Sequence, residues 1–374
     1  MNSQSMEAQE RDFLCTVALN AMMPLAKERT LQAGFHILRG RKANQTVQDV
    51  HLYSLYPYYR LFPRMAKEGW ENILSFFREL GYIREITATE EGNGKPSFFV
   101  TEAGRKFADE RYAYYELDKW FQPFGQALPT RSLEIFWQRL HLVVQSISHM
   151  LAVEMNFYPV VRDRQIQTWV KRQIGDPAKR ERWKQELGEE LWRLWEVLPE
   201  DVQQLLVAQL SGVSQVGKTI GQLALQRRVA PSFLHVQFRY GLAVSMERVQ
   251  RESSSFPLLS HLAEAGGEQA VGLSESAART YALVQRGLPK EEIARIRRIK
   301  ESTVEDHLAE IALRCPEWDC SDLLPDELAV QIVRTSEQLG TNRLRLIKDH
   351  LQGTVSYLQI RLALARRQEG KQRA

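Results

Sequence analysis

The chain has 374 residues, of which 44% are hydrophobic and 26% charged, and its formal net charge is +4. This composition is that of an ordinary globular protein and excludes a disordered or collagen-like chain. The length predicts two or three domains. The mild positive charge permits nucleic-acid binding but does not require it, and any basic surface must be a local stripe.

The chain has three cysteines, an odd and small number that argues against a disulfide framework and for a reducing compartment. No apolar run reaches the length of a membrane span. The first residues, MNSQSMEAQERDF, lack the basic segment and apolar core of a signal peptide. We therefore expect a cytoplasmic protein, and we leave association with the nucleoid open.

Residues 1–111 are expected to form the first domain. A helix over 8–31 is followed by a basic turn, RGRK, a helix that Thr46 could cap, and an amphipathic helix, GWENILSFFREL. YIREITAT and SFFVT, on either side of the turn EGNGKP, predict two strands. Helices followed by a hairpin predict a winged helix, with a plain α+β cap as the alternative. The candidate phosphate contacts are Arg39, Arg41, Lys42 and, in the hairpin loop, Lys95.

Residues 112–262 predict an almost wholly helical middle domain. Tryptophans at helical spacing, among them Trp183, Trp192 and Trp195, are typical of a core rather than of a base-stacking surface. Serine, glycine and proline clusters over 251–269 predict a linker into the last domain. The expected fold class is therefore mainly α.

Residues 212–219, GVSQVGKT, match the phosphate-loop pattern G-x-x-x-x-G-K-[ST]. A phosphate loop follows a buried strand, whereas the preceding DVQQLLVAQLS has helical spacing, so Lys218 and Thr219 are expected to begin a helix instead. No other catalytic or metal-ligand spacing is present. We expect a protein that is not an enzyme and has no cofactor or metal, with nucleotide hydrolysis through 212–219 as a remote alternative.

Residues 271–374 are expected to form a C-terminal helix-turn-helix domain. The stretch ARTYALVQRGLPKEEIARIRRIKESTVEDHLAEIAL, residues 278–313, predicts three helices separated by two tight turns. Gly287 and Pro289 mark the first turn, and Ser302 with Glu305 suggests a capping box on the third helix. The residues expected to be buried are Ile293, Ala294 and Ile296 in the second helix and Val304, Leu308 and Ile311 in the third.

The third helix of this motif normally enters the major groove of DNA. The candidate phosphate contacts are Arg295, Arg297, Arg298, Lys300, Ser302 and Thr303. Three acidic residues of the same helix would instead be repelled by phosphates, and we predict that they bind a protein partner: Glu305, Asp306 and Glu310. The sequence leaves open whether the helix contacts DNA or protein.

Two other segments of the chain show a weak similarity to this motif, which we call the internal echo. Thr46-Val47-Gln48-Asp49 and Thr303-Val304-Glu305-Asp306 both follow a basic turn after a helix, and GKTIGQLALQRRVAPSFL, residues 217–234, resembles a third such hairpin. These matches are too short to establish a repeat from the sequence.

Four segments carry a resemblance to a known family: LRGRKANQTVQD, GKTIGQLA, GLPKEEIARIRRIKESTVEDHL and TVSYLQIRLALA. Through them the chain resembles the YpbB-like family of Bacillus-type bacteria. The last two also resemble the helix-turn-helix domain appended to some RecQ-type DNA helicases. The resemblance implies a DNA-associated accessory protein without a helicase motor, acting in DNA repair or recombination with a RecQ-type helicase as its partner.

The helix-turn-helix is also similar to the DNA-reading motif of LuxR-type regulators. A sequence-specific transcription regulator is therefore the alternative function. Such regulators favour basic residues where this chain has Glu305 and Asp306, and this departure leaves a protein-docking role for the helix open.

Overall fold

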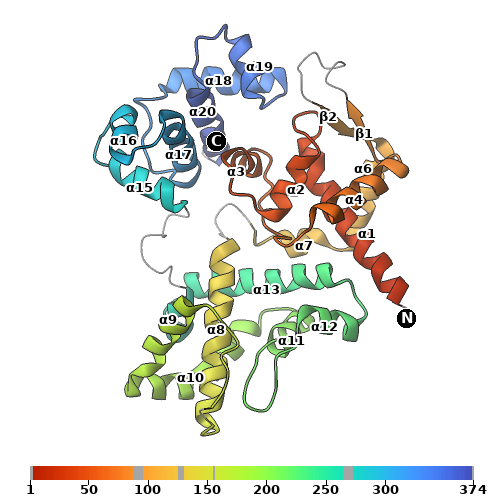
Figure 1. Ribbon diagram of the computed structural model, residues 1–374, viewed down its shortest axis with the longest axis vertical. Coiled ribbons are helices and arrows are strands. Elements are labelled where there is room, and N and C mark those ends of the chain that lie inside the picture. The colour runs from red at the N-terminus through yellow and green to blue at the C-terminus, as the bar shows by residue number, and fades with distance from the viewer. Residues whose placement is uncertain (1–2, 87–95, 125–129, 155, 264–272, 373–374) are drawn as a thin grey trace. The chain divides into compact units, whose positions relative to one another are not determined.

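The computed structural model describes residues 3–86, 96–124, 130–154, 156–263 and 273–372. Contacts divide the chain into two compact units. We call Met1–Val17 with Asp109–Glu264 the middle unit, and Ala18–Ala108 with Ala265–Ala374 the composite unit. These units describe which segments pack together and do not test which segments fold independently. The predicted domains 1–111, 112–262 and 271–374 therefore stay a prediction. The mainly α fold class is confirmed, since the described residues contain two short strands among many helices (Figure 1).

The middle unit is built from helices alone within its described residues. These are the first part of α1 (Ser3–Met22), the last part of α6 (Glu102–Tyr114), α7 (Leu117–Phe121), α8 (Thr130–Leu151), α9 (Arg164–Gly175), α10 (Pro177–Trp195), α11 (Glu200–Ala208), α12 (Ile220–Arg227), α13 (Pro231–Arg251) and α14 (Pro257–Ala263).

Helical spacing explains what the middle unit buries and what it exposes. Trp183 and Trp195 are buried in α10, as predicted. The expectation for Trp192 is wrong, since 68% of it is exposed. It lies nine residues after Trp183, which places it on the opposite face of the helix at 100° per residue.

The predicted linker over 251–269 is also partly wrong, because its residues 257–263 form helix α14. The buried carboxylate of Glu190 explains why a helix starts there. It accepts hydrogen bonds from the backbone N–H groups of Leu258, at 3.0 and 3.2 Å, and Leu259, at 3.0 Å. A carboxylate at a helix N-terminus satisfies unpaired donors and complements the helix dipole.

The composite unit joins the N-terminal and C-terminal parts of the chain. Its elements are the last part of α1, the 3-10 helix Met23–Leu25, α2 (Gln32–Arg39), α3 (Asn44–Leu52), α4 (Lys67–Glu79), β1 (Ile83–Ile86), β2 (Ser97–Val100), the first part of α6, α15 (Glu275–Val284), α16 (Lys290–Arg297), α17 (Glu301–Arg314), α18 (Asp326–Leu339), α19 (Leu344–His350) and α20 (Tyr357–Gln372).

The predicted hairpin is present. β1 and β2 pair antiparallel, with Ile83 opposite Val100. Helices and hairpin follow one another in the predicted order, but a winged-helix arrangement is not established. The connecting turn over 87–95, which includes the candidate Lys95, lies outside the described residues.

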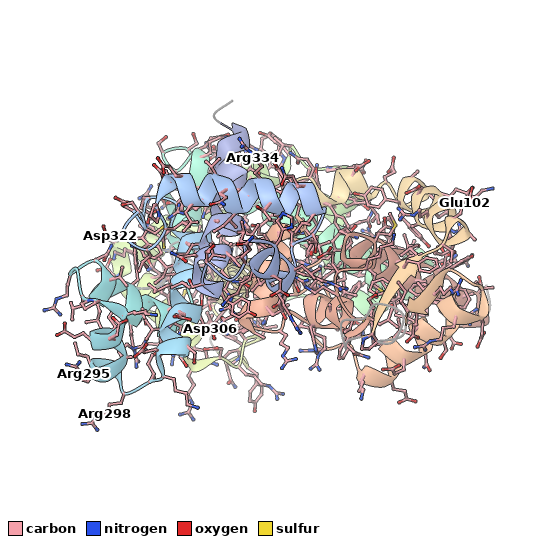
Figure 2. All side chains as sticks on the ribbon, turned by 90° about the horizontal axis from the view of Figure 1, so that it is seen from above. Glu102, Arg295, Arg298, Asp306, Asp322 and Arg334 are labelled. Carbon is pink, nitrogen blue, oxygen red and sulfur yellow. The ribbon has the colours of Figure 1, made fainter. Side chains whose placement is uncertain are left out.

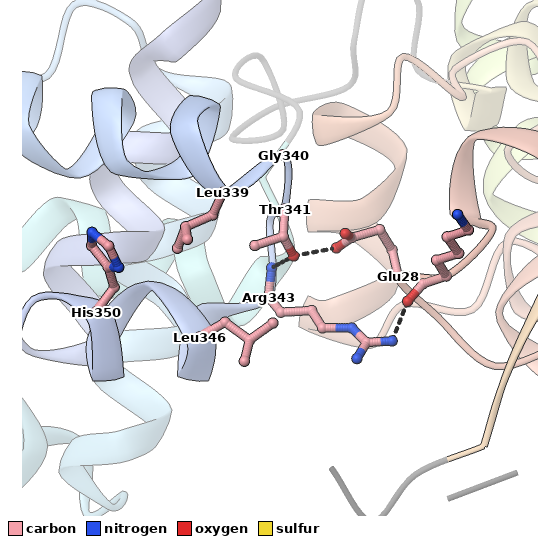
Figure 3. A pocket seen from close by; sticks show the side chains of 8 residues that line it. Glu28, Leu339, Gly340, Thr341, Arg343, Leu346 and His350 are labelled. Atoms are coloured by element: carbon pink, nitrogen blue, oxygen red, sulfur yellow. Dashed lines mark hydrogen bonds between the residues drawn. The ribbon is translucent and has the colours of Figure 1, made fainter. Parts of the chain in front are cut away.

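Polar contacts tie the two ends of the chain together within the composite unit (Figure 3). The carboxylate of Glu28 accepts hydrogen bonds from the Thr341 hydroxyl at 3.0 Å and from the Asn342 N–H at 3.2 Å. The Arg343 guanidinium donates to the carbonyl of Lys27. The His51 imidazole bonds the carbonyl oxygen of Ala365 at 3.0 Å.

No helix in the described parts of the chain combines the length and the apolar character needed to cross a membrane.

Candidate nucleic-acid interface

Helices α15, α16 and α17 form the predicted helix-turn-helix. Its core holds Tyr281, Ile293, Val304 and Leu308, all of which are buried. The expectation for Ile296 is wrong, because 53% of it is exposed. The buried face of α16 is centred on Ile293 and Ala294, and Ile296 lies well off that arc at helical spacing.

Two residues in the left-handed region shape the turns of the motif. Gly287, with φ +77°, ends α15, as the sequence predicts. Arg298, with φ +52°, ends α16, and the next N–H, of Ile299, donates to the Ala294 carbonyl at 3.1 Å. Position 298 costs an L-residue with a side chain some strain, since only glycine adopts this conformation freely.

The start of α17 differs from the prediction. The helix begins at Glu301 after the extended residue Lys300, and no side chain caps it. Ser302, the predicted cap, therefore lies in the first turn and is exposed. A helix N-terminus without a side-chain cap presents backbone N–H groups, which favour an anion such as a phosphate. Thr303, the neighbouring hydroxyl, is half-buried.

Three of the predicted cations are exposed near this helix start: Arg295, Arg298 and Lys300. Figure 2 shows Arg295 and Arg298 at the edge of the composite unit with their side chains directed outward. Their charge is therefore available for a phosphate backbone.

Arg297 points inward instead. Its guanidinium donates to the Ser276 carbonyl at 2.7 Å, to the Ser276 hydroxyl at 3.0 Å and to the Thr280 hydroxyl. Position 297 is four residues after Ile293 and three after Ala294, so it shares their buried face. The same spacing is readable in the sequence and could have separated Arg297 from its exposed neighbours.

The Thr280 hydroxyl lies 2.9 Å from Nδ1 of the buried His307. This hydroxyl accepts from Arg297 and can donate its own hydrogen to Nδ1 when Nδ1 carries no proton. Burial lowers the pKa of His307, and the charge of Arg297 lowers it further. The ring is therefore part of a buried polar cluster that favours its neutral form.

The acidic residues of α17 have partners inside the composite unit. Glu305 pairs with Lys290 at 2.7 Å, and the hydrogen bond from Lys290 raises the pKa of that lysine. Asp306 pairs with Arg361 at 2.6 Å. Glu310 accepts from the Ser274 N–H at 2.5 Å and its hydroxyl at 2.9 Å, at the start of α15. The two ion pairs neutralise the carboxylates of Glu305 and Asp306, which the sequence alone would place free in solvent.

The predicted basic turn after α2 is a second exposed group of cations, made of Arg39, Arg41 and Lys42. A guanidinium nitrogen of Arg41 lies 3.0 Å from Nε2 of His36. Burial lowers the pKa of His36, and the charges of Arg41 and Arg39 lower it further. The following helix starts at Asn44 after Ala43, so the predicted cap Thr46 is wrong; its side chain is buried.

The internal echo is a geometric repeat. The α12–α13 and α16–α17 hairpins match at an offset of 70 residues. Arg228 has φ +59° and Arg298 has φ +52°, and in both turns the next residue's N–H donates to a carbonyl five residues earlier at 3.1 Å. The residues buried at matching positions are Leu223 and Ile293, Ala224 and Ala294, and Leu234 and Val304.

The turn between α2 and α3 is similar but one residue longer. Gly40, with φ +71°, takes the left-handed position, and α3 begins four residues later rather than three. A turn of this kind redirects the chain at one left-handed residue, which glycine adopts without strain.

The three hairpins differ in what covers their second helix. In α13, Ser232 donates both its N–H and its hydroxyl to Glu10, and Phe233 packs on Phe13, with ring centroids 5.3 Å apart. In α3, five residues are buried, namely Thr46, Gln48, Asp49, Val50 and His51. The matching Ser302 of α17 is exposed, and so is Gln45, its counterpart in α3. Among these three described hairpins, α12–α13 is therefore the one in which other parts of the chain cover the start of the second helix.

The loop over 212–219 lacks the geometry of a phosphate loop. It follows helix α11, and its backbone N–H groups donate within the protein. These bonds run from Gly212 to the Gln215 carbonyl, from Val213 to the Ser148 hydroxyl, from Gly217 to the Ser211 hydroxyl and from Lys218 to the Ala208 carbonyl, at 2.8–3.1 Å. These amides are therefore not free to cradle a phosphate.

The two signature side chains of that loop are also engaged. The Lys218 ammonium donates to Gln226 at 2.9 Å, and Thr219 forms a reciprocal capping box with Gln222 at the start of α12. The G-K-T of the pattern therefore ends at the N-terminal cap of α12, Thr219. Among the described residues, no group of three or more His, Cys, Asp or Glu side chains could hold a metal ion.

Comparison with known proteins agrees with the helix-turn-helix geometry. A family described as a helix-turn-helix domain matches residues 276–364. The chain is also 26% identical over 355 residues to Protein YpbB of Bacillus subtilis (strain 168), covering 95% of this chain and 97% of that protein. No solved structure matches the chain. The matches support the predicted YpbB-like family with a helix-turn-helix domain, and they suggest a DNA-binding protein of that class.

Proposed function

We propose that the chain is a non-catalytic DNA-binding adaptor that acts as the accessory partner of a RecQ-type DNA helicase. The observation that carries the DNA-binding part is the exposed start of α17 with Arg295, Arg298 and Lys300 around it. Phosphate contacts from a few cations supply binding that is weak, salt-sensitive and indifferent to sequence.

Two basic groups take part in this proposal. The first is Arg295, Arg298 and Lys300, with Ser302 and Thr303 as hydroxyl donors, and the second is Arg39, Arg41 and Lys42. Both belong to the composite unit. Arg297 is left out of the contact set, because its guanidinium is bonded to Ser276 and Thr280.

The helicase part of the proposal rests on the resemblance of the C-terminal domain to the one appended to RecQ-type helicases. A domain that some helicases carry in the same chain can act on a helicase from a separate chain. Docking through Glu305, Asp306 and Glu310 stays a prediction. It would compete with the pairs that these residues make to Lys290, Arg361 and Ser274.

Co-elution tests this part directly. The purified chain and the purified RecQ-type helicase of the same genome should elute together on size exclusion and separate at high salt, since a charged interface is screened. Independent elution at every salt concentration, with a specific operator duplex bound far more tightly than random DNA, would instead support a transcription regulator.

A further inference from the structure

A groove in the middle unit has no place in the proposed DNA contacts. It lies along α8, α9 and α10, which pack side by side (Figure 1), and encloses about 640 Å³. Its floor is apolar and includes Leu142, Met150, Phe157, Val170 and Ile174. This volume falls within the range of small-molecule sites, which are mostly apolar with a few polar groups that fix orientation.

The charged side chains that line the groove have one sign. Lys171, Arg180 and Lys184 line it, and no carboxylate is among the described residues that do so. Arg180 is held in place by hydrogen bonds to the carbonyls of Ile174 and Gly175, each at 2.9 Å. Lys184 makes a surface pair with Glu181 at 3.4 Å, which is weak at such exposure. The rim therefore favours an anionic group.

The polar side chains inside the groove already have partners. The Ser146 hydroxyl donates to the Leu142 carbonyl at 2.8 Å, and the Gln167 amide donates to the Val161 carbonyl at 2.8 Å. An occupant need not supply acceptors for these donors. The body of the occupant is therefore expected to be apolar, with its polar group at the basic rim.

The mouth of the groove holds an apolar side chain in an uncommon backbone conformation. Val153 lines the groove, is 85% exposed and has φ +59°. A β-branched residue in the left-handed region is strained. Such strain concentrates at ligand sites.

We propose that this groove binds a small amphipathic anion, specifically an unbranched acyl carboxylate. Its chain lies on the apolar floor, and its carboxylate meets Lys171 and Lys184. The proposal is independent of the DNA contacts, which involve residues of the composite unit only.

Calorimetric titration of the full chain tests it with dodecanoate below its micelle-forming concentration. Decanoate and octanoate test chain length, and dodecylammonium and dodecanol test charge. Dodecanoate should bind with one site, at least ten-fold more tightly than dodecylammonium. Each CH₂ group removed should weaken binding roughly four-fold.

Variants locate the site. Lys171→Glu with Lys184→Glu should weaken dodecanoate binding at least ten-fold, and so should Val153→Asp, whose exposed position spares the fold. The matched control, Arg172→Glu with Lys179→Glu, makes the same charge change on exposed residues that do not line the groove and should leave binding unchanged.

Equal affinity for the anion and the cation would overturn the proposal, and so would an equal effect of the two double variants. Absence of heat with dodecanoate at two well-separated temperatures would also overturn it, since the enthalpy of apolar burial changes strongly with temperature. An acidic peptide that binds the groove and is not displaced by dodecanoate would overturn it as well. DNA binding measured on the same variants should not change, so failure here is distinguishable from failure of the proposed function.

Discussion

Neighbouring arginines of one helix have different tasks. Arg295 is exposed, whereas Arg297 donates three hydrogen bonds to Ser276 and Thr280. The difference follows from helical spacing, because Arg297 lies four positions after Ile293 and three after Ala294 and so falls between them on the buried face.

Substitution should separate the two roles. Arg297→Ala leaves the buried Thr280 hydroxyl without its donor, besides the exposed acceptors of Ser276, and should lower the free energy of unfolding by about 1–3 kcal/mol. Arg295→Ala should change it by less than about 0.5 kcal/mol, as is usual for surface positions. Urea unfolding of both variants measures the difference. Equal decreases would mean that Arg297 is not a structural residue.

The pH dependence of stability should report His307. Its pKa is lowered in the folded chain from the ordinary value of 6.5, so the unfolded state binds more protons as the pH falls below that value. The contribution of a neutral His307 to stability is therefore complete above about pH 6.5 and disappears as the pH falls toward the lowered folded pKa.

His307→Gln should flatten this dependence, because glutamine does not titrate. Thermal midpoints between pH 7.5 and 5.5 compare the variant with the parent chain, in which burial also lowers the pKa values of His36 and His141. An identical fall in both proteins would show that His307 does not contribute.

At the scale of elements, local spacing predicts much of the helix-turn-helix. Gly287 ends α15 as expected, and Val304, Leu308 and Ile311 are buried as expected. What the sequence could not show depends on distant residues. Arg361 is 55 positions from its partner Asp306, and no periodicity reports such a pair. The predicted cap at Ser302 is wrong because α17 starts earlier, directly after the extended residue Lys300.

The turn at Arg298 gives an element-scale prediction. Arg298→Gly relieves a side chain from the left-handed region and should keep or raise the free energy of unfolding, by up to about 1 kcal/mol. Arg295→Gly removes the same charge from inside α16 and should lower it by about 1 kcal/mol. Denaturant midpoints compare the two. A decrease at Arg298 as large as that at Arg295 would be inconsistent with the turn geometry.

The cap at the start of α12 gives a second prediction at the scale of elements. Thr219→Ala removes a capping box and should cost about 1 kcal/mol of stability. Lys218→Ala breaks an exposed bond to Gln226 and should leave stability within about 0.5 kcal/mol. Neither variant should alter nucleotide turnover, which we expect to be absent. ATP or GTP hydrolysis that disappears in Lys218→Ala with the fold intact would restore the phosphate-loop alternative.

At the scale of the whole molecule, the sequence order of the elements is a poor guide to their packing. Residues 18–108 and 265–374 form one unit although about 150 residues separate them. Contacts such as Glu28 to Thr341 and His51 to Ala365 create that unit. They join side chains whose local patterns give no sign of each other. The sequence predicted the α class and the helix-turn-helix, but not this union of the two ends.

Packing at this scale also determines which of the three related hairpins has an exposed turn. The hairpins have similar turns, and the surrounding chain covers the start of the second helix in one of them. Glu10 and Phe13 cover the start of α13 within the middle unit. The proposed phosphate contacts lie at the other two turns, α2–α3 and α16–α17, where Gln45 and Ser302 are exposed.

The central claim is that exposed cations at the α16–α17 turn bind the phosphate backbone. Its most direct measurement is fluorescence anisotropy of a labelled 20-base-pair duplex over a salt series. The dependence of log K on log salt should become shallower by about 2 in Arg295→Ala with Lys300→Ala, one unit for each cation removed from the phosphates. Arg334→Ala with Arg345→Ala removes two exposed cations of α18 and α19 and should leave the slope unchanged. The same slope in both double variants and the parent chain would contradict the claim.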